Sequence, residues 1–109
     1  MKDILEELNK AFEHRIRLGI MSLLMVHDQI DFATLKTQLN VTDGNLASHL
    51  TALEKAGYME VSKRFIGKKP NTSYHATASG KSAFALHLDA LERFIRQSAS
   101  TPKPKTNQT

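Results

Sequence analysis

The chain of 109 residues contains no cysteine, and this absence removes several kinds of chemistry. Disulfides, thiolate metal sites and cysteine nucleophiles are all excluded, and a reducing cytoplasm suits such a chain. The longest apolar run, from Leu18 to Val26, is far shorter than the ~20 residues that a membrane-spanning helix needs. The acidic amino terminus, MKDILEELNK, lacks the pattern of a secretory signal. We therefore expect a cytoplasmic protein with no membrane partner.

Motifs for catalysis are also absent. The sequence has no glycine-rich phosphate loop, no HExxH helix and no GxSxG elbow, so we expect no enzyme activity and no cofactor. His87 with Asp89 and Glu92 is the one alternative for a metal site between subunits. We expect no metal there, because the spacing matches no recognised ligand pattern and a surface histidine is commoner.

The length and net charge of the chain further limit the class of protein it can be. A chain with 40% hydrophobic residues at this length supports one compact domain, which we place at residues 1–97. The tail at residues 98–109, SASTPKPKTNQT, is basic and almost without apolar residues, so we expect it to be disordered. The net charge of +4 suggests a polyanionic partner without proving one.

The segment from Thr42 to Tyr58 carries the clearest helical signal. Leu46, Leu50 and Leu53 form one apolar stripe, Thr42 suits the N-cap, and Gly57 suits a left-handed C-cap. The outward positions of this helix, at about residues 43–56, are small, polar and almost uncharged. Such a face can lie close against a partner surface, although an exposed helix with short side chains is the alternative.

A shorter helix precedes this one. Asp31 is the expected N-cap of a helix with sequence FATLKTQL, and Asn40 and Val41 leave room only for a tight turn before Thr42. Asn40 tolerates the left-handed conformation that such a turn requires. Two short helices joined in this way are typical of a helix-turn-helix.

Alternating residues follow Gly57 and predict a β-hairpin at about residues 59–77. One strand runs from about Met59 to Ile66, a basic turn follows, and a second strand covers Thr72 to Thr77. From Ser62 through Lys81 there are five basic residues and no acidic one. Positive charge therefore lies beside the helix at about residues 43–56, although a merely solvated tip is the alternative.

Helices at the two ends carry more apolar surface than one small core needs. In the first helix, Ile4 lies on the same side as Leu5, Leu8 and Phe12. The last helix begins near Ala78, with Thr77 as its N-cap, and runs to about Gln97. We expect these helices to form a homodimer interface, with packing within one chain as the alternative. The candidate interface residues are Leu5, Leu8, Phe12, Phe84, Leu88, Leu91 and Ile95.

Three stretches, HRIRLGIMSLL, VTDGNLASHLTALEKAGYMEV and TSYHATASGKSAF, resemble small winged helix-turn-helix transcriptional regulators of the MarR, ArsR and PadR-like group. The resemblance covers about Ala11 to Leu88. It implies a mainly α fold with a small β-hairpin (α+β) and N- and C-terminal dimerisation helices. It also implies that Asp43 to Ala56 enters the major groove while the hairpin acts as a wing. The paired cysteines of metal-sensing ArsR-like repressors are missing.

The DNA-binding residues expected from this arrangement fall into two sets. Side chains that could reach base edges or phosphates from the recognition helix are Asn45, Ser48, His49 and Thr51. Those expected at the DNA backbone or the minor groove are Thr34, Thr42, Arg64, Lys68 and Lys69.

The function expected from the sequence is sequence-specific binding of double-stranded DNA by a transcriptional regulator. We expect a homodimeric repressor that acts by occupying its operator. The main alternative is a winged helix that docks a protein without specific DNA binding. Double-stranded RNA is a weaker alternative, because a helix cannot read its deep, narrow groove. A small-molecule effector between the dimerisation helices and the DNA-binding core is left open.

Overall fold

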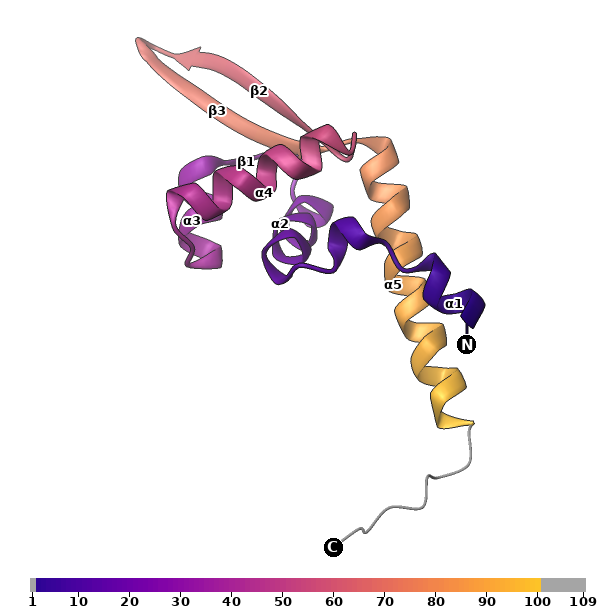
Figure 1. Ribbon diagram of the computed structural model, residues 1–109. Helices are drawn as coiled ribbons and strands as arrows, with labels where there is room; N and C mark the ends of the chain where they lie inside the picture. The colour runs from indigo at the N-terminus through magenta and orange to yellow at the C-terminus, as the bar shows by residue number, and fades with distance from the viewer. Residues whose placement is uncertain (1, 101–109) are drawn as a thin grey trace, which may run out of the picture.

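The computed structural model describes residues 2–100, which form a mainly helical fold with one small antiparallel sheet (Figure 1). The predicted fold class is confirmed. In chain order the elements are α1 (Lys2–Glu7), a 3-10 turn η1 (Lys10–Phe12), α2 (Arg15–Val26), β1 (Ile30–Asp31), α3 (Phe32–Leu39), α4 (Asp43–Lys55), β2 (Met59–Ile66), β3 (Lys69–Ala76) and α5 (Ala78–Ala99).

The core lies where α2, α3 and α4 meet the base of the sheet and the first turns of α5. Its members are large aliphatic and aromatic side chains at helical or alternating spacing, which is why each element buries a single face. The largest of those less than 2% exposed are Phe12, Phe84, Ile20, Met21, Leu24, Leu35, Leu46, Leu53 and Met59. The stripe predicted on α4 is confirmed, since Leu46, Leu50 and Leu53 are all buried.

The hairpin is joined by a short third strand that the sequence did not predict. In the sheet order β1-β3-β2, Ile30 pairs with Tyr74 and Asp31 with Ser73. Two residues carry too little alternation to predict a strand, and β1 exists because β3 offers it a free edge. Strand β3 also begins at Lys69, earlier than expected, which leaves only Gly67 and Lys68 in the turn.

The base of the hairpin is held tightly against the start of α5. The Thr77 hydroxyl accepts a hydrogen bond from Gly80 N at 2.9 Å and donates one to Gly57 O at 2.7 Å. The Thr77 backbone N–H donates to Tyr58 O at 3.1 Å. A Cβ atom on Gly80 would lie 2.0 Å from Tyr58 O, so only glycine permits this approach.

The amino-terminal segment differs from the single helix predicted through Phe12. Helix α1 ends at Glu7, and η1 starts after Asn9, whose side chain accepts a hydrogen bond from Ala11 N at 2.9 Å. Asn9 also donates from Nδ2 to the Tyr58 hydroxyl at 2.9 Å. An asparagine that bonds its neighbouring backbone favours a cap over a helix interior, which explains the break.

Helix α5 projects beyond the core, as Figure 1 shows. Its buried residues are Gly80, Phe84, His87 and Ala90, and none lies beyond Ala90 in this helix of 22 residues. The radius of gyration is 17.6 Å, against ~13 Å for a compact domain of 100 residues. The second half of α5 therefore has little of its own chain to pack against apart from α1.

Helix α1 packs along α5 and is fastened to it by charge. Arg93 donates two hydrogen bonds to the Glu7 carboxylate, at 2.8 and 2.9 Å, and one to Asp89 at 2.8 Å. Of the tail predicted to be disordered from residue 98, Ser98 and Ala99 belong to α5. The prediction for residues 101–109 falls outside the described residues.

Candidate nucleic-acid interface

Side-chain caps define where α3 and α4 begin, on either side of the short turn that joins them. Asp31 Oδ1 accepts from Thr34 N at 2.7 Å, and Thr42 Oγ1 accepts from Asn45 N at 3.2 Å. Asn40 has a φ of 52°, the left-handed conformation predicted for this turn. A 2.9 Å ion pair between Lys36 and Asp43 also links the two helices. The helix-turn-helix is therefore confirmed as a structural unit.

The outer face of α4 is exposed and slightly hollow. Ala47, Ser48, Thr51, Ala52 and Lys55 line an open depression of about 410 Å³. Small side chains leave this hollow because they extend less far from the helix axis than the long charged residues common on helix surfaces. The exposed predicted contacts on this face are Asn45, Ser48 and Thr51. All three can donate and accept hydrogen bonds at short range.

His49, also predicted as a DNA contact, lies at the side of α4 and is half-buried. Its ring stacks on that of His14, with centroids 4.0 Å apart. Burial lowers the pKa of His49, and the charges of His14 and Arg17 lower it further. Arg17 Nε is itself buried and has no hydrogen-bond partner among residues 2–100. The imidazole of His49 thus faces α2 as well as solvent, a contact that sequence analysis missed because His14 lies 35 positions earlier.

His14 explains how α2 begins. Its Nδ1 accepts a hydrogen bond from Ile16 N at 3.1 Å, so the imidazole acts as the N-cap. Sequence analysis did not predict this cap, because histidine is not among the common capping residues. The cap fixes the ring against which His49 stacks.

The hairpin presents basic side chains along its outer part. Arg64, Lys68 and Lys69 are all exposed, as are Phe65 and Ile66 between them, at 73% and 61%. No aspartate or glutamate occurs between Glu60 and Asp89. The sequence predicted the basic charge, and the structure adds that Phe65 lies in solvent at the tip.

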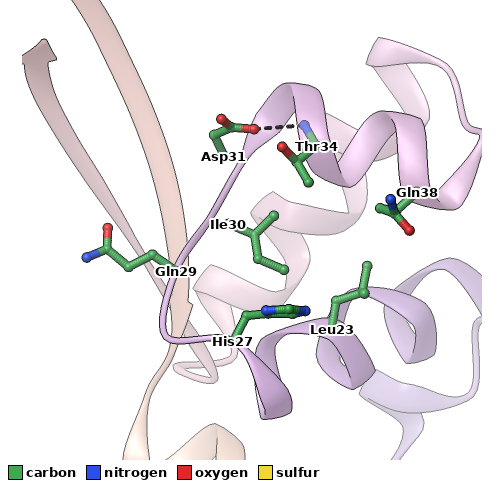
Figure 2. A pocket seen from close by; sticks show the side chains of 7 residues that line it. All are labelled: Leu23, His27, Gln29, Ile30, Asp31, Thr34 and Gln38. Atoms are coloured by element: carbon green, nitrogen blue, oxygen red, sulfur yellow. Dashed lines mark hydrogen bonds between the residues drawn. The ribbon is translucent and has the colours of Figure 1, made fainter.

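Thr34 and Thr42 lie at the first turns of α3 and α4, and both are exposed. Thr34 lines an open pocket of about 390 Å³ between the end of α2, β1 and α3 (Figure 2). The sequence did not predict this pocket, because β1 creates one of its walls. The other residues lining it are Leu23, His27, Gln29, Ile30, Asp31 and Gln38.

The residues predicted for dimerisation divide into two groups. Phe12 and Phe84 are only 1% and 2% exposed and stack edge to face with centroids 5.1 Å apart, so they belong to the core of the single chain. Their prediction as interface residues is wrong, because amphipathic spacing does not say which neighbour an apolar face meets. Leu5, Leu88 and Ile95 are 52%, 44% and 68% exposed, and Leu8 and Leu91 are half-buried.

An exposed apolar residue on α5 was missed. Leu86 is 61% exposed. Its spacing from Leu88 and Ile95 does not fit a simple i, i+3, i+4 stripe, which is why the pattern did not include it.

His87 does not combine with Asp89 and Glu92, the alternative weighed from the sequence. It is 4% exposed, and its Nδ1 accepts a hydrogen bond from Asn9 N at 2.9 Å. Asp89 and Glu92 instead pair with Arg93 and Arg96. Among residues 2–100 no group of three or more histidine and acidic side chains is placed to hold a metal.

Residues 16–95 match the model of the winged helix DNA-binding domain family, and the chain belongs to that family. Its fold and family are those of DNA-binding proteins that regulate transcription. Within the described chain, no helix is long and apolar enough to cross a membrane.

Individual relatives agree with this assignment. An uncharacterised protein of Methanocaldococcus jannaschii is 39% identical over 79 residues, which are 72% of this chain and 86% of that protein. The structure of a transcriptional regulator homologue from Pyrococcus horikoshii has a TM-score of 0.81 at 28% identity, covering 90% of this chain and 98% of that one.

The structure of NadR, in complex with 4-hydroxyphenylacetate, gives a TM-score of 0.65 at 25% identity over 91% of this chain and 70% of that one. A MarR-family regulator of Porphyromonas gingivalis and a PadR-like factor of Bacteroides fragilis share the fold. The resemblance to this regulator group is confirmed.

Proposed function

We propose that the protein binds specific sequences in double-stranded DNA as a homodimer and represses transcription by occupying its operator. One observation carries this proposal. The exposed face of α4 is small and polar, and the neighbouring hairpin is basic, with no acidic residue from Val61 to Leu88. A major groove about 12 Å wide admits an α-helix, and its flanking phosphates attract basic side chains.

In this arrangement α4 reads bases and the hairpin holds the backbone. Asn45, Ser48 and Thr51 offer hydrogen bonds to base edges, while Ala47 and Ala52 let the helix approach closely. Arg64, Lys68 and Lys69 neutralise phosphates. Thr34 and Thr42 contribute exposed hydroxyls near the helix starts, where the helix dipole favours a phosphate. His49 reaches DNA only from the edge of α4, because its ring is stacked on His14.

Dimerisation uses the projecting half of α5 together with α1. The exposed side chains Leu5, Leu88 and Ile95 would otherwise meet water. A two-fold pair of such helices buries them against each other, since the same patch meets itself in such a dimer. Phe12 and Phe84 support these helices from within.

Repression follows from the area of DNA that this dimer would cover. Two α4 helices and two hairpins would occupy major grooves and the adjacent backbone on one side of the duplex. A site that overlaps a promoter would then be closed to polymerase. A small-molecule effector would bind in the space between the dimerisation helices and the DNA-binding core.

The experiment is selection from a random pool of duplex DNA with the purified protein, followed by sequencing of the retained molecules. Enrichment of an inverted repeat with half-sites ~34 Å apart, about one helical turn, would support both sequence readout and the two-fold dimer. Retention without a motif would leave only charge-driven binding. No retention at low salt would favour the alternative of a winged helix that docks a protein.

A further inference from the structure

The outermost part of the hairpin combines three apolar residues with three cations, an arrangement that the phosphate contacts do not explain. We define the wing tip as residues 64–70, with the sequence RFIGKKP. Phe65 pairs with Pro70 and Ile66 with Lys69 across the strands, so the pairing continues to the two-residue turn. Phe65 and Ile66 nevertheless remain 73% and 61% exposed, and the tip projects away from the helices (Figure 1).

The side of the hairpin on which Phe65 lies is set by the strand register. Phe65 shares a face of β2 with Met59 and Val61, because side chains alternate along a strand. Val61 and Lys63 on that face line a groove with Leu50 and Thr51 of α4. Cross-strand partners project to the same side, so Pro70 joins Phe65 there. The aromatic ring therefore extends the surface that includes the recognition helix.

The length of the hairpin matches the spacing of DNA grooves. Met59 is buried at its base, and six residues of extended chain, ~20 Å, separate Met59 from Phe65. Neighbouring major and minor grooves lie about half a helical turn apart, ~17 Å on one side of B-DNA. With α4 in the major groove, the wing tip reaches the adjacent minor groove.

We propose that Phe65 enters this minor groove as an apolar wedge that partly unstacks one base step and bends the duplex, while Arg64, Lys68 and Lys69 hold the phosphates on either side. The inference rests on the proposed DNA-binding function. Charge complementarity favours DNA as the occupant, because the cations surround the apolar residues and no acidic side chain lies on the hairpin beyond Glu60. Apolar side chains that bend DNA in this way favour flexible pyrimidine-purine steps.

The wedge makes a prediction that phosphate contacts do not share. Losing a cation changes the salt dependence of binding, whereas losing an uncharged ring changes affinity and DNA shape at the same salt slope. Phe65→Ala removes the ring, Phe65→Leu keeps an apolar wedge, and Lys68→Ala is the matched control that removes only charge. Both residues are exposed, so all three variants should fold, which their melting temperatures would verify.

The test uses the duplex retained from the random pool, with dyes at both ends to report bending and 2-aminopurine placed in turn at steps flanking the motif. Wild type should brighten one 2-aminopurine position through unstacking and should bring the dyes closer. Phe65→Ala should abolish the brightening, reduce the bend and weaken binding about tenfold at an unchanged salt slope. Phe65→Leu should retain most of both signals, and Lys68→Ala should flatten the slope while keeping the brightening.

Two results would overturn the wedge. One is a Phe65→Ala variant that binds and bends the duplex as wild type does. The other is a wild type that binds the duplex without unstacking any base step. If Phe65→Ala also abolished self-association in sedimentation, the wing tip would be a contact between two copies of the chain. If the wild-type protein retained no duplex at all, the proposed DNA-binding function itself would be refuted. That outcome differs from either result that overturns the wedge alone, because in both of those the wild type still binds DNA.

Discussion

The backbone N–H of Asn9 donates a 2.9 Å hydrogen bond to Nδ1 of His87, which joins the amino-terminal segment to the buried side of α5. Nδ1 is therefore an acceptor, and the imidazole is neutral with its hydrogen on Nε2. Phe12 covers the ring from one side, with centroids 5.5 Å apart. This bond exists only while His87 is unprotonated, so the link between the two ends of the domain depends on pH.

Stability should fall on acidification because of this histidine. Burial lowers the pKa of His87, while the Glu13 carboxylate opposes the shift. A proton therefore binds the unfolded chain before the folded one, and stability is lost as pH falls below the unfolded pKa of ~6.5. His87→Gln, which can still accept from Asn9 N, should lose less stability than wild type between pH 7.5 and 5 in thermal melts.

The control for this pH effect is His75→Gln, on the exposed hairpin beside Glu60. It should leave the acid-induced loss in place. His49 contributes in the same direction as His87, because its pKa is also lowered. An identical pH profile for wild type and His87→Gln would show that the Asn9 bond does not set the acid sensitivity.

Gly80→Ala should destabilise the fold by about 1–3 kcal/mol, since the new methyl group would press on the Tyr58 carbonyl. Gly44→Ala is the matched control. A Cβ at Gly44 meets nothing within 4 Å, and alanine favours a helix, so this variant should gain about 0.5–1 kcal/mol. Chemical denaturation of both variants would measure the difference, and equal stabilities would contradict the close approach at the wing base.

Replacing Lys68 and Lys69 together by alanine should weaken binding to all duplexes alike. Each phosphate contact contributes about 0.9 to the slope of log affinity against log salt, so a dimer losing four contacts should lose about 3.6. Titrations at several salt concentrations would measure the slope. Lys10→Ala, in η1 away from the hairpin, should leave the slope unchanged, and an equally unchanged slope for the double variant would remove the wing from the interface.

Ser48→Ala should alter base preference more than overall affinity. Ser48 lines the hollow on α4 and can bond a base edge, so its loss should reduce discrimination at one base-pair position by about 1–3 kcal/mol. Selection from a random pool, compared with wild type, would show the relaxed position. Ser22→Ala, on α2, is the control that should keep the wild-type motif. A motif unchanged by Ser48→Ala would place base readout elsewhere.

Ile95→Asp should convert the proposed dimer into monomers, because a carboxylate would be buried at the helix pair. Sedimentation at several protein concentrations would report the change. Val26→Asp is the control, since Val26 is 75% exposed but lies at the end of α2. A dimer that persists in Ile95→Asp would move the interface away from this part of α5.

Local chemistry decided much of the fold. Thr42 and Asp31 cap their helices as predicted, Asn40 adopts the left-handed turn, and β2 has the expected bounds. These features depend on residues within a few positions of one another, so the order of amino acids specifies them directly. The basic wing and the small side chains on the neighbouring helix could also be predicted from the sequence, because charge and side-chain size do not depend on folding.

Tertiary structure decided which surfaces are available. The spacing that marked Phe12 and Phe84 as apolar did not reveal that they would bury each other, nor that Leu86 would face solvent. The stacking of His49 on His14, the bond from Asn9 to His87 and the pairing of β1 with β3 each join residues far apart in the chain. Such contacts depend on how faces are matched in space, and periodicity along one element carries no information about its neighbour.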